Sequence, residues 1–193
     1  MFKVMLVDGN AERSDSLKDE LGATAGTEVI CVDSSKDLMK QVREHSPDVI
    51  IIEMASPDRD TLESLRTVNR ETPKPVVFFA EHSDHETTQS AINAGVSAYI
   101  VDGLSTSRLN SIMDVAIANF KAFQKLKIEL EDTKLRLQDR KDVDKAKGIL
   151  MQHRNLNEEE AYQLLRKMAM DRNMKIGDAS RNFVAAMSLL GDS

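Results

Sequence analysis

The chain has 193 residues, of which 30% are charged, and its formal net charge at pH 7 is −6. Its single cysteine excludes an intrachain disulfide and fits a reducing compartment. No run of about eighteen apolar residues is present, and the first residues do not resemble a signal peptide, so we expect a cytoplasmic protein with no membrane partner.

The charge is divided unevenly along the chain. Residues 1–104 carry 10 Lys and Arg against 19 Asp and Glu, a net of −9, whereas the remaining residues carry 16 against 13, a net of +3. The first part would repel a polyanion strongly and the second would not. If the protein binds a nucleic acid, the binding region is therefore expected after residue 104.

Short apolar runs alternate with amphipathic segments through the first hundred residues. The runs predict strands at 2–7, 28–32, 48–52, 76–79 and 98–101, and the segments between them predict helices at 11–21, 34–44, 59–70 and 85–94. This alternation is typical of a flavodoxin-like parallel sheet in an α/β domain. In such a sheet, ligand chemistry takes place at the carboxyl ends of the strands.

Three stretches of this first part, Leu6 to Asp8, Pro47 to Pro57 and Ala94 to Tyr99, resemble the receiver domain of response regulators. The resemblance covers residues 1–104. It implies an acceptor Asp after the third strand and a pair of acids that hold Mg²⁺ after the first. It also implies a hydroxyl after the fourth strand and a Lys after the fifth.

The positions that carry this chemistry in a receiver are altered here. Glu53 stands at the acceptor position, Gly9 replaces one acid and leaves Asp8 alone, Ala80 replaces the hydroxyl, and Asp102 replaces the Lys. A phosphoryl group would meet carboxylates instead of a cation, which is strongly repulsive. We therefore predict a pseudo-receiver that is not phosphorylated and holds no metal or cofactor. A cation held by the three carboxylates is the weaker alternative, and Glu53 either mimics a charged acceptor or marks a site that has drifted.

A long segment without proline follows, from Ser105 to about His153. Residues in it recur at alternating steps of three and four, which defines the narrow stripe of a heptad repeat. One small domain would not cover so long a helix, so residues 105–139 are predicted to form a coiled coil with a second copy. The alternative is a helix that lies on its own domain. The heptad stripe consists of Leu109, Ile112, Ala116, Asn119, Phe123, Leu126, Leu130, Thr133, Leu137 and Arg140.

Residues 140–193 predict an all-α bundle of three helices. The long helix ends near residue 153, Asn157 and Glu160 have the spacing of a capping box that starts a second helix, and a third is expected at 175–190. Arg140 and Lys147 fall on one face of the first helix, and Tyr162 lies on the second.

Motifs in this bundle, Ala146 to Met151, Glu160 to Tyr162, Leu165-Arg166 and Ile176 to Ala179, resemble the ANTAR domain of the AmiR/NasR class of antiterminators. The resemblance implies a dimer that binds two-hairpin leader mRNA and prevents terminator formation. Within this class the chain is most similar to regulators of nitrate and nitrite assimilation. That similarity implies control by a NasS-like nitrate-sensing protein rather than by phosphorylation.

The residues expected at the RNA are mostly basic. Loop bases offer their faces to aromatic rings and Arg planes, and phosphates attract Lys and Arg. Tyr162 is expected to stack on a base or to join the core, and the small Gly148 would allow close approach of RNA or of a helix. The expected polar contacts are Arg140, Lys147, Arg166 and Lys167.

Three other classes of function compete with antitermination. A DNA-binding response-regulator-like transcription factor is the alternative, although Glu158, Glu159 and Glu160 would repel phosphates at the start of a recognition helix. A dimeric adaptor would not need the ANTAR-like motifs. An enzyme is not expected, because the sequence has no Gly-rich phosphate loop, no catalytic Ser/His/Asp spacing and no Cys/His cluster.

Overall fold

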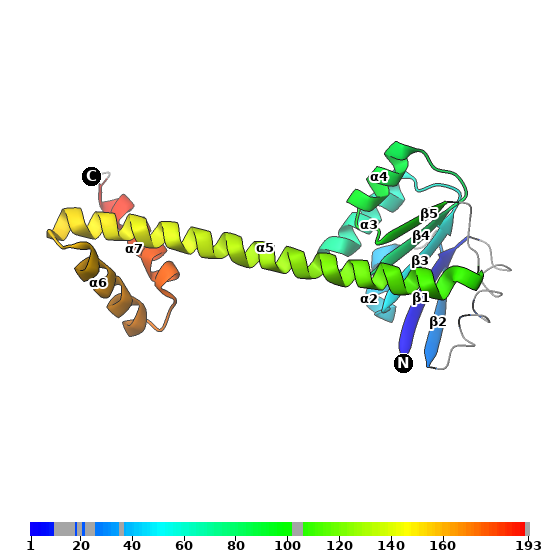
Figure 1. Cartoon of the computed structure of the whole chain (residues 1–193), viewed down its shortest axis with the longest axis horizontal. Coiled ribbons are helices and arrows are strands. Elements are labelled where there is room, and N and C mark those ends of the chain that lie inside the picture. Colours follow the sequence, from blue (N-terminus) through cyan, green and yellow to red (C-terminus); the bar gives the residue numbers. More distant parts are fainter. Residues whose placement is uncertain (10–17, 19–20, 22–25, 35–36, 102–105, 192–193) are drawn as a thin grey trace. The chain divides into compact units, whose positions relative to one another are not determined.

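The computed structural model describes residues 1–9, 18, 21, 26–34, 37–101 and 106–191 (Figure 1). The chain divides into two compact units, Met1–Gln124 and Lys125–Ser193, and helix α5 (Thr106–Arg154) contributes to both. Nearly all of the helix expected at 11–21 lies outside the described residues, as does Asp102. Among the described helices, none combines the length and apolar character that a membrane crossing requires.

The described part of the first unit contains a parallel sheet with the strand order β2-β1-β3-β4-β5. This order confirms the predicted flavodoxin-like α/β fold. The observed strands extend the predicted ones by at most two residues at their carboxyl ends, because pairing with neighbours continues past the apolar runs. They are β1 (Phe2–Asp8), β2 (Thr27–Asp33), β3 (Val49–Met54), β4 (Val76–Ala80) and β5 (Ala98–Val101).

Helices α2 (Leu38–His45), α3 (Arg59–Glu71) and α4 (His85–Asn93) connect these strands. Each begins after an aspartate, and the carboxylate of that aspartate accepts a hydrogen bond from a backbone N–H of the first turn. Helix α2 begins later than the predicted residue 34, since its cap is Asp37 rather than a serine.

Both faces of the sheet are covered by apolar side chains. One face packs Met5, Ile50 and Phe78 against the connecting helices. The other packs Val4, Leu6, Ile51 and Phe79 against Leu109, Met113 and Ala116 of α5. The amino-terminal part of α5 is therefore the last layer of the first unit.

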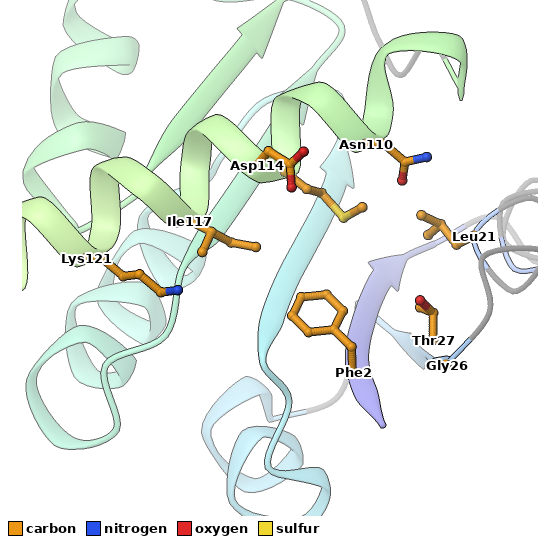
Figure 2. Close-up of a pocket in the computed structure, with 9 residues that line it drawn as sticks. Phe2, Leu21, Gly26, Thr27, Asn110, Asp114, Ile117 and Lys121 are labelled. Atoms are coloured by element: carbon orange, nitrogen blue, oxygen red, sulfur yellow. The ribbon is translucent and has the colours of Figure 1, made fainter.

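A hollow of about 580 Å³ remains where α5 passes the amino end of β1 (Figure 2). The Phe2 ring and Ile117 lie at its apolar side, and Asn110, Asp114 and Lys121 of α5 bring polar groups to it. Because Phe2 is the first residue of β1, this hollow is at the opposite end of the strand from Asp8.

The heptad stripe of α5 is covered in one part and bare in the next. Leu109 is 1% exposed and Ala116 is fully buried, whereas Phe123, Leu126 and Leu130 are 62%, 63% and 54% exposed. The alternative of a helix lying on its own domain is thus right for the beginning of the stripe. Pairing of the remainder with a second copy stays a prediction.

The second unit combines the carboxyl-terminal part of α5 with α6 (Glu158–Asp171) and α7 (Ile176–Gly191). The capping box is present: Asn157 accepts from the Glu160 N–H and the Glu160 carboxylate accepts from the Asn157 N–H. Ala146, Leu150, Ala161 and Leu165 form the core, joined by partly buried side chains of α7 such as Phe183 and Val184. Ala186 of α7 is exposed, because Ser180, Phe183 and Val184 define the inward face of this helix.

Candidate functional site

The altered receiver positions meet at the carboxyl edge of the sheet. Asp8 ends β1 and is the register partner of Glu53 on β3, so their backbones are one strand spacing apart, about 4.8 Å. The two carboxylate side chains are 5% and 4% exposed. Ala80 is buried at the end of β4 and is the register partner of Met54. This edge holds two enclosed carboxylates and an alanine in place of the hydroxyl, an arrangement poorly suited to an incoming anion.

The described residues contain no group of three or more His, Cys, Asp or Glu side chains placed to hold a metal ion. Asp102, the third carboxylate of the cation site given as the weaker alternative, lies outside those residues.

Between α2 and α3 the same edge opens into an acidic groove that the sequence analysis missed. Its cavity measures about 780 Å³ and is lined by Asp37, Asp58, Asp60 and Glu63 beside apolar side chains of the sheet. Asp58 is a helix cap, and hydrogen bonds from the Thr61 side chain and backbone hold the pKa of its carboxyl below the usual value. The available signal was the repeated Asp before each helix, which indicates caps rather than a binding groove.

In the second unit, helix α6 presents a mixed aromatic, basic and apolar stripe to solvent. Tyr162, Arg166 and Met170 are spaced by four residues and so share one face. Tyr162 is 39% exposed and Met170 is 70% exposed, while Arg166 and the neighbouring Lys167 are also exposed. The opposite face of α6 carries the buried Ala161, Leu165 and Ala169.

The two basic residues expected on α5 differ in their surroundings. Arg140 is exposed. Lys147 is held between carboxylates, with Nζ 2.7 Å from Glu158 Oε1 and 2.9 Å from Asp144 Oδ1, and its side chain is 16% exposed. The Glu158 contact, with Asp144 adding to it, raises the pKa of Lys147, and the Lys147 contact lowers the pKa of Asp144.

Two glycines of this unit have opposite surroundings. Apart from the neighbouring backbone of α5 itself, a Cβ added to Gly148 would meet no atom of the described residues within 4 Å, so that side of α5 is open in the described part of the chain. A Cβ added to Gly177 would lie 2.4 Å from Asp139 Cγ, which shows how closely α7 approaches α5.

Arg181 ties α7 to α5 at this point, and sequence reasoning missed it. It binds Asp139 and Asp142 of α5 at 3.0 Å each and Asp178 at 3.2 Å. These carboxylates, Asp142 first, raise the pKa of the guanidinium. The spacing of Asp178 and Arg181 was visible in the sequence, but the partners on α5 are about forty residues away and belong to no motif.

The fold and the altered edge define a receiver-type regulator, and residues 4–114 match the response regulator receiver domain. The chain belongs to the response regulator family. Residues 131–184 match the ANTAR domain, which makes the chain an ANTAR response regulator.

Named relatives agree with both assignments. The chain is 30% identical over 128 residues to the transcriptional regulatory protein PdtaR of Mycobacterium tuberculosis, covering 66% of this chain and 62% of that protein. It is 39% identical over 66 residues to the nitrate regulatory protein of Klebsiella oxytoca, covering 34% of this chain and 17% of that one. A CheY-like receiver domain from Methanospirillum hungatei shares the fold, with a TM-score of 0.55 at 18% identity over 63% of this chain and 98% of that structure.

Proposed function

We propose that this protein is a transcription antitermination regulator that binds two-hairpin leader mRNA through residues 140–193 and prevents formation of a terminator. The observation that carries the proposal is the exposed stripe of Tyr162 and Arg166 within the region matching the ANTAR domain. An aromatic ring and a guanidinium one turn apart suit unpaired loop bases, which proteins recognise by stacking and hydrogen bonding.

Phosphate contacts are assigned to exposed cations on α5 and α6. Arg140 on α5 and Arg166 and Lys167 on α6 are exposed, and the part of the chain after residue 104 has a net charge of +3. Lys147 and Gly148 belong to the same motif on α5, where Gly148 leaves room for a close approach. A homodimer formed by the coiled coil would carry two such modules and so match two hairpins, raising affinity without new contacts.

The regulated genes are proposed to be those of nitrate and nitrite assimilation, and the chain is proposed to be a regulator of the NasT type. The similarity to the nitrate regulatory protein supports this assignment. Control would come from a cytoplasmic NasS-like nitrate-sensing protein rather than from phosphorylation. The enclosed Asp8 and Glu53 and the missing hydroxyl at Ala80 support a mechanism without phosphoryl transfer, metal or cofactor.

The test is a gel-shift titration of the full-length protein against a two-hairpin leader RNA, a single-hairpin RNA and a duplex DNA of matched length, each at two salt concentrations. We expect tight binding to the two-hairpin RNA alone. Arg166→Ala should weaken that binding by about tenfold or more, because both a stacking plane and a charge are lost.

Arg59→Ala is the matched control, since it removes the same charge from a side chain that is 88% exposed in the first unit. It should leave RNA affinity within about twofold of the wild type. Preference for the duplex DNA would instead identify a promoter-binding transcription factor. Equal binding to all three nucleic acids would reduce the interaction to non-specific charge attraction.

A further inference from the structure

Lys147 is the ANTAR-motif cation whose surroundings suit an RNA phosphate least. Glu158 and Asp144 already occupy its ammonium at 2.7 and 2.9 Å, and its side chain is 16% exposed. The three charged groups sum to −1, so a phosphate approaching this ammonium would meet two carboxylates at short range. Arg140, Arg166 and Lys167 are exposed, and the charge of Arg140 helps to lower the pKa of the Asp144 carboxyl.

The partner of Lys147 lies where it can set the orientation of α6. Glu158 is the first residue of α6, and Tyr162 and Arg166 follow at spacings of four, so all three share one face of the helix. The turn before α6 passes through Asn155, whose φ is 52°, and the capping box at Asn157 then begins the helix.

The capping box is local, because its hydrogen bonds join residues three apart. It determines where α6 begins but not how α6 is rotated against α5. The bond from Lys147 to Glu158 joins residues eleven apart on the two helices and adds that constraint. It acts beside the core contact of Ala146 and Ala161, both fully buried.

We propose that Lys147 is a positioning residue, whose tie to Glu158 holds α6 in the orientation in which Tyr162 and Arg166 face the RNA. This inference rests on the proposed RNA-binding function and deepens it. Glu158, a carboxylate that would itself repel RNA, becomes part of the binding module through Lys147.

The experiment is a double-mutant cycle on the full-length protein with Lys147→Met, Glu158→Gln and the pair, titrated with two-hairpin leader RNA over a range of salt. We expect both single variants to weaken binding by a similar factor, about three- to tenfold, and the pair to be no weaker than the worse single variant. The slope of log affinity against log salt should be unchanged in Lys147→Met.

If Lys147 instead contacted an RNA phosphate directly, Glu158→Gln would change RNA affinity in the opposite direction. Glu158→Gln would then tighten RNA binding by releasing the ammonium, and Lys147→Met would reduce the salt slope by about 0.7 to 0.9. Either result would overturn the positioning role. Lys145→Met, an exposed lysine on the same helix, is the matched control and should be additive with Glu158→Gln.

Melting curves of the same variants without RNA separate this inference from the proposed function. Lys147→Met and Glu158→Gln should each lower the melting temperature, and the pair should lower it no further. Additive shifts, or none, would show that the tie does not hold the helices. Failure of the wild type to bind two-hairpin RNA would refute the proposed function while the melting cycle still decided whether the tie exists.

Discussion

Two parts of helix α5 carry the same heptad stripe and have opposite surroundings. In the first part Leu109 and Ala116 are buried against the sheet, whereas in the second part Leu126, Leu130 and Leu137 are 63%, 54% and 56% exposed. One periodic pattern therefore serves intramolecular packing at one end and leaves an apolar surface at the other. Periodicity indicates which face of a helix is apolar and tends to be buried, but not which element or partner buries it.

The largest effect is expected from Leu109→Ala. Leu109 is 1% exposed, so truncation leaves a cavity in the first unit and should cost about 2–5 kcal/mol in the free energy of unfolding. Leu135→Ala removes the same atoms from a side chain that is 63% exposed and should cost less than about 0.5 kcal/mol. Chemical denaturation of both variants measures the difference, and equal losses would erase the contrast between the two parts of α5.

The next effect tests whether the bare part pairs with a second copy. Leu126→Asn with Leu130→Asn should raise the dimer dissociation constant by about a hundredfold, because two side chains would no longer be buried between the helices. Sedimentation over a range of concentrations measures this constant.

Ile128→Asn with Leu135→Asn is the control pair, since these side chains are 65% and 63% exposed but lie off the heptad stripe. This pair should leave the dissociation constant within about threefold of the wild type. If the control pair disrupts the dimer and the stripe pair does not, the partner lies on the other face of α5.

A smaller effect is expected where α5 is covered again, by α7. In Gly177→Ala the new Cβ would lie 2.4 Å from Asp139 Cγ, which forces Asp139 and its bond to Arg181 to move, at a cost of about 1–3 kcal/mol. Gly148→Ala meets open space and should stabilise the helix by up to about 1 kcal/mol. Thermal melting of the two variants gives the signs; a stabilised Gly177→Ala would mean that α7 does not approach α5 so closely.

The smallest expected effect is a pH dependence of the stability of the second unit. The Lys147 contact lowers the pKa of Asp144 below its usual 3.8, so its stabilising contribution is present above about pH 4 and is lost as the pH falls through the lowered pKa. Lys147 has a pKa raised above 10.5, so its contribution is present below that pH and is lost as the pH rises through the raised value. The melting-temperature difference between wild type and Lys147→Met should therefore shrink at both extremes of pH, and a constant difference would contradict the pairing.

Much of the architecture followed from local patterns. The apolar runs predicted the strands of the sheet to within two residues, and Asn157 with Glu160 predicted the start of α6, because hydrophobic burial and helix capping act between residues close in the chain. The identities of Glu53 at the acceptor position and Ala80 at the hydroxyl position were also readable from the sequence alone.

Contacts between distant residues were decided by the tertiary structure. The sequence alone marked Lys147 as a basic residue of a motif, but only the fold places Glu158 against it, and only the fold brings Arg181 to Asp139 and Asp142. The heptad stripe likewise has one period along its length, and the position of the sheet determines where it is buried. The sequence by itself determined the elements and their apolar faces, since these depend on neighbours along the chain. Which charges are neutralised and which faces stay bare depends on packing between elements, and no local pattern encodes that.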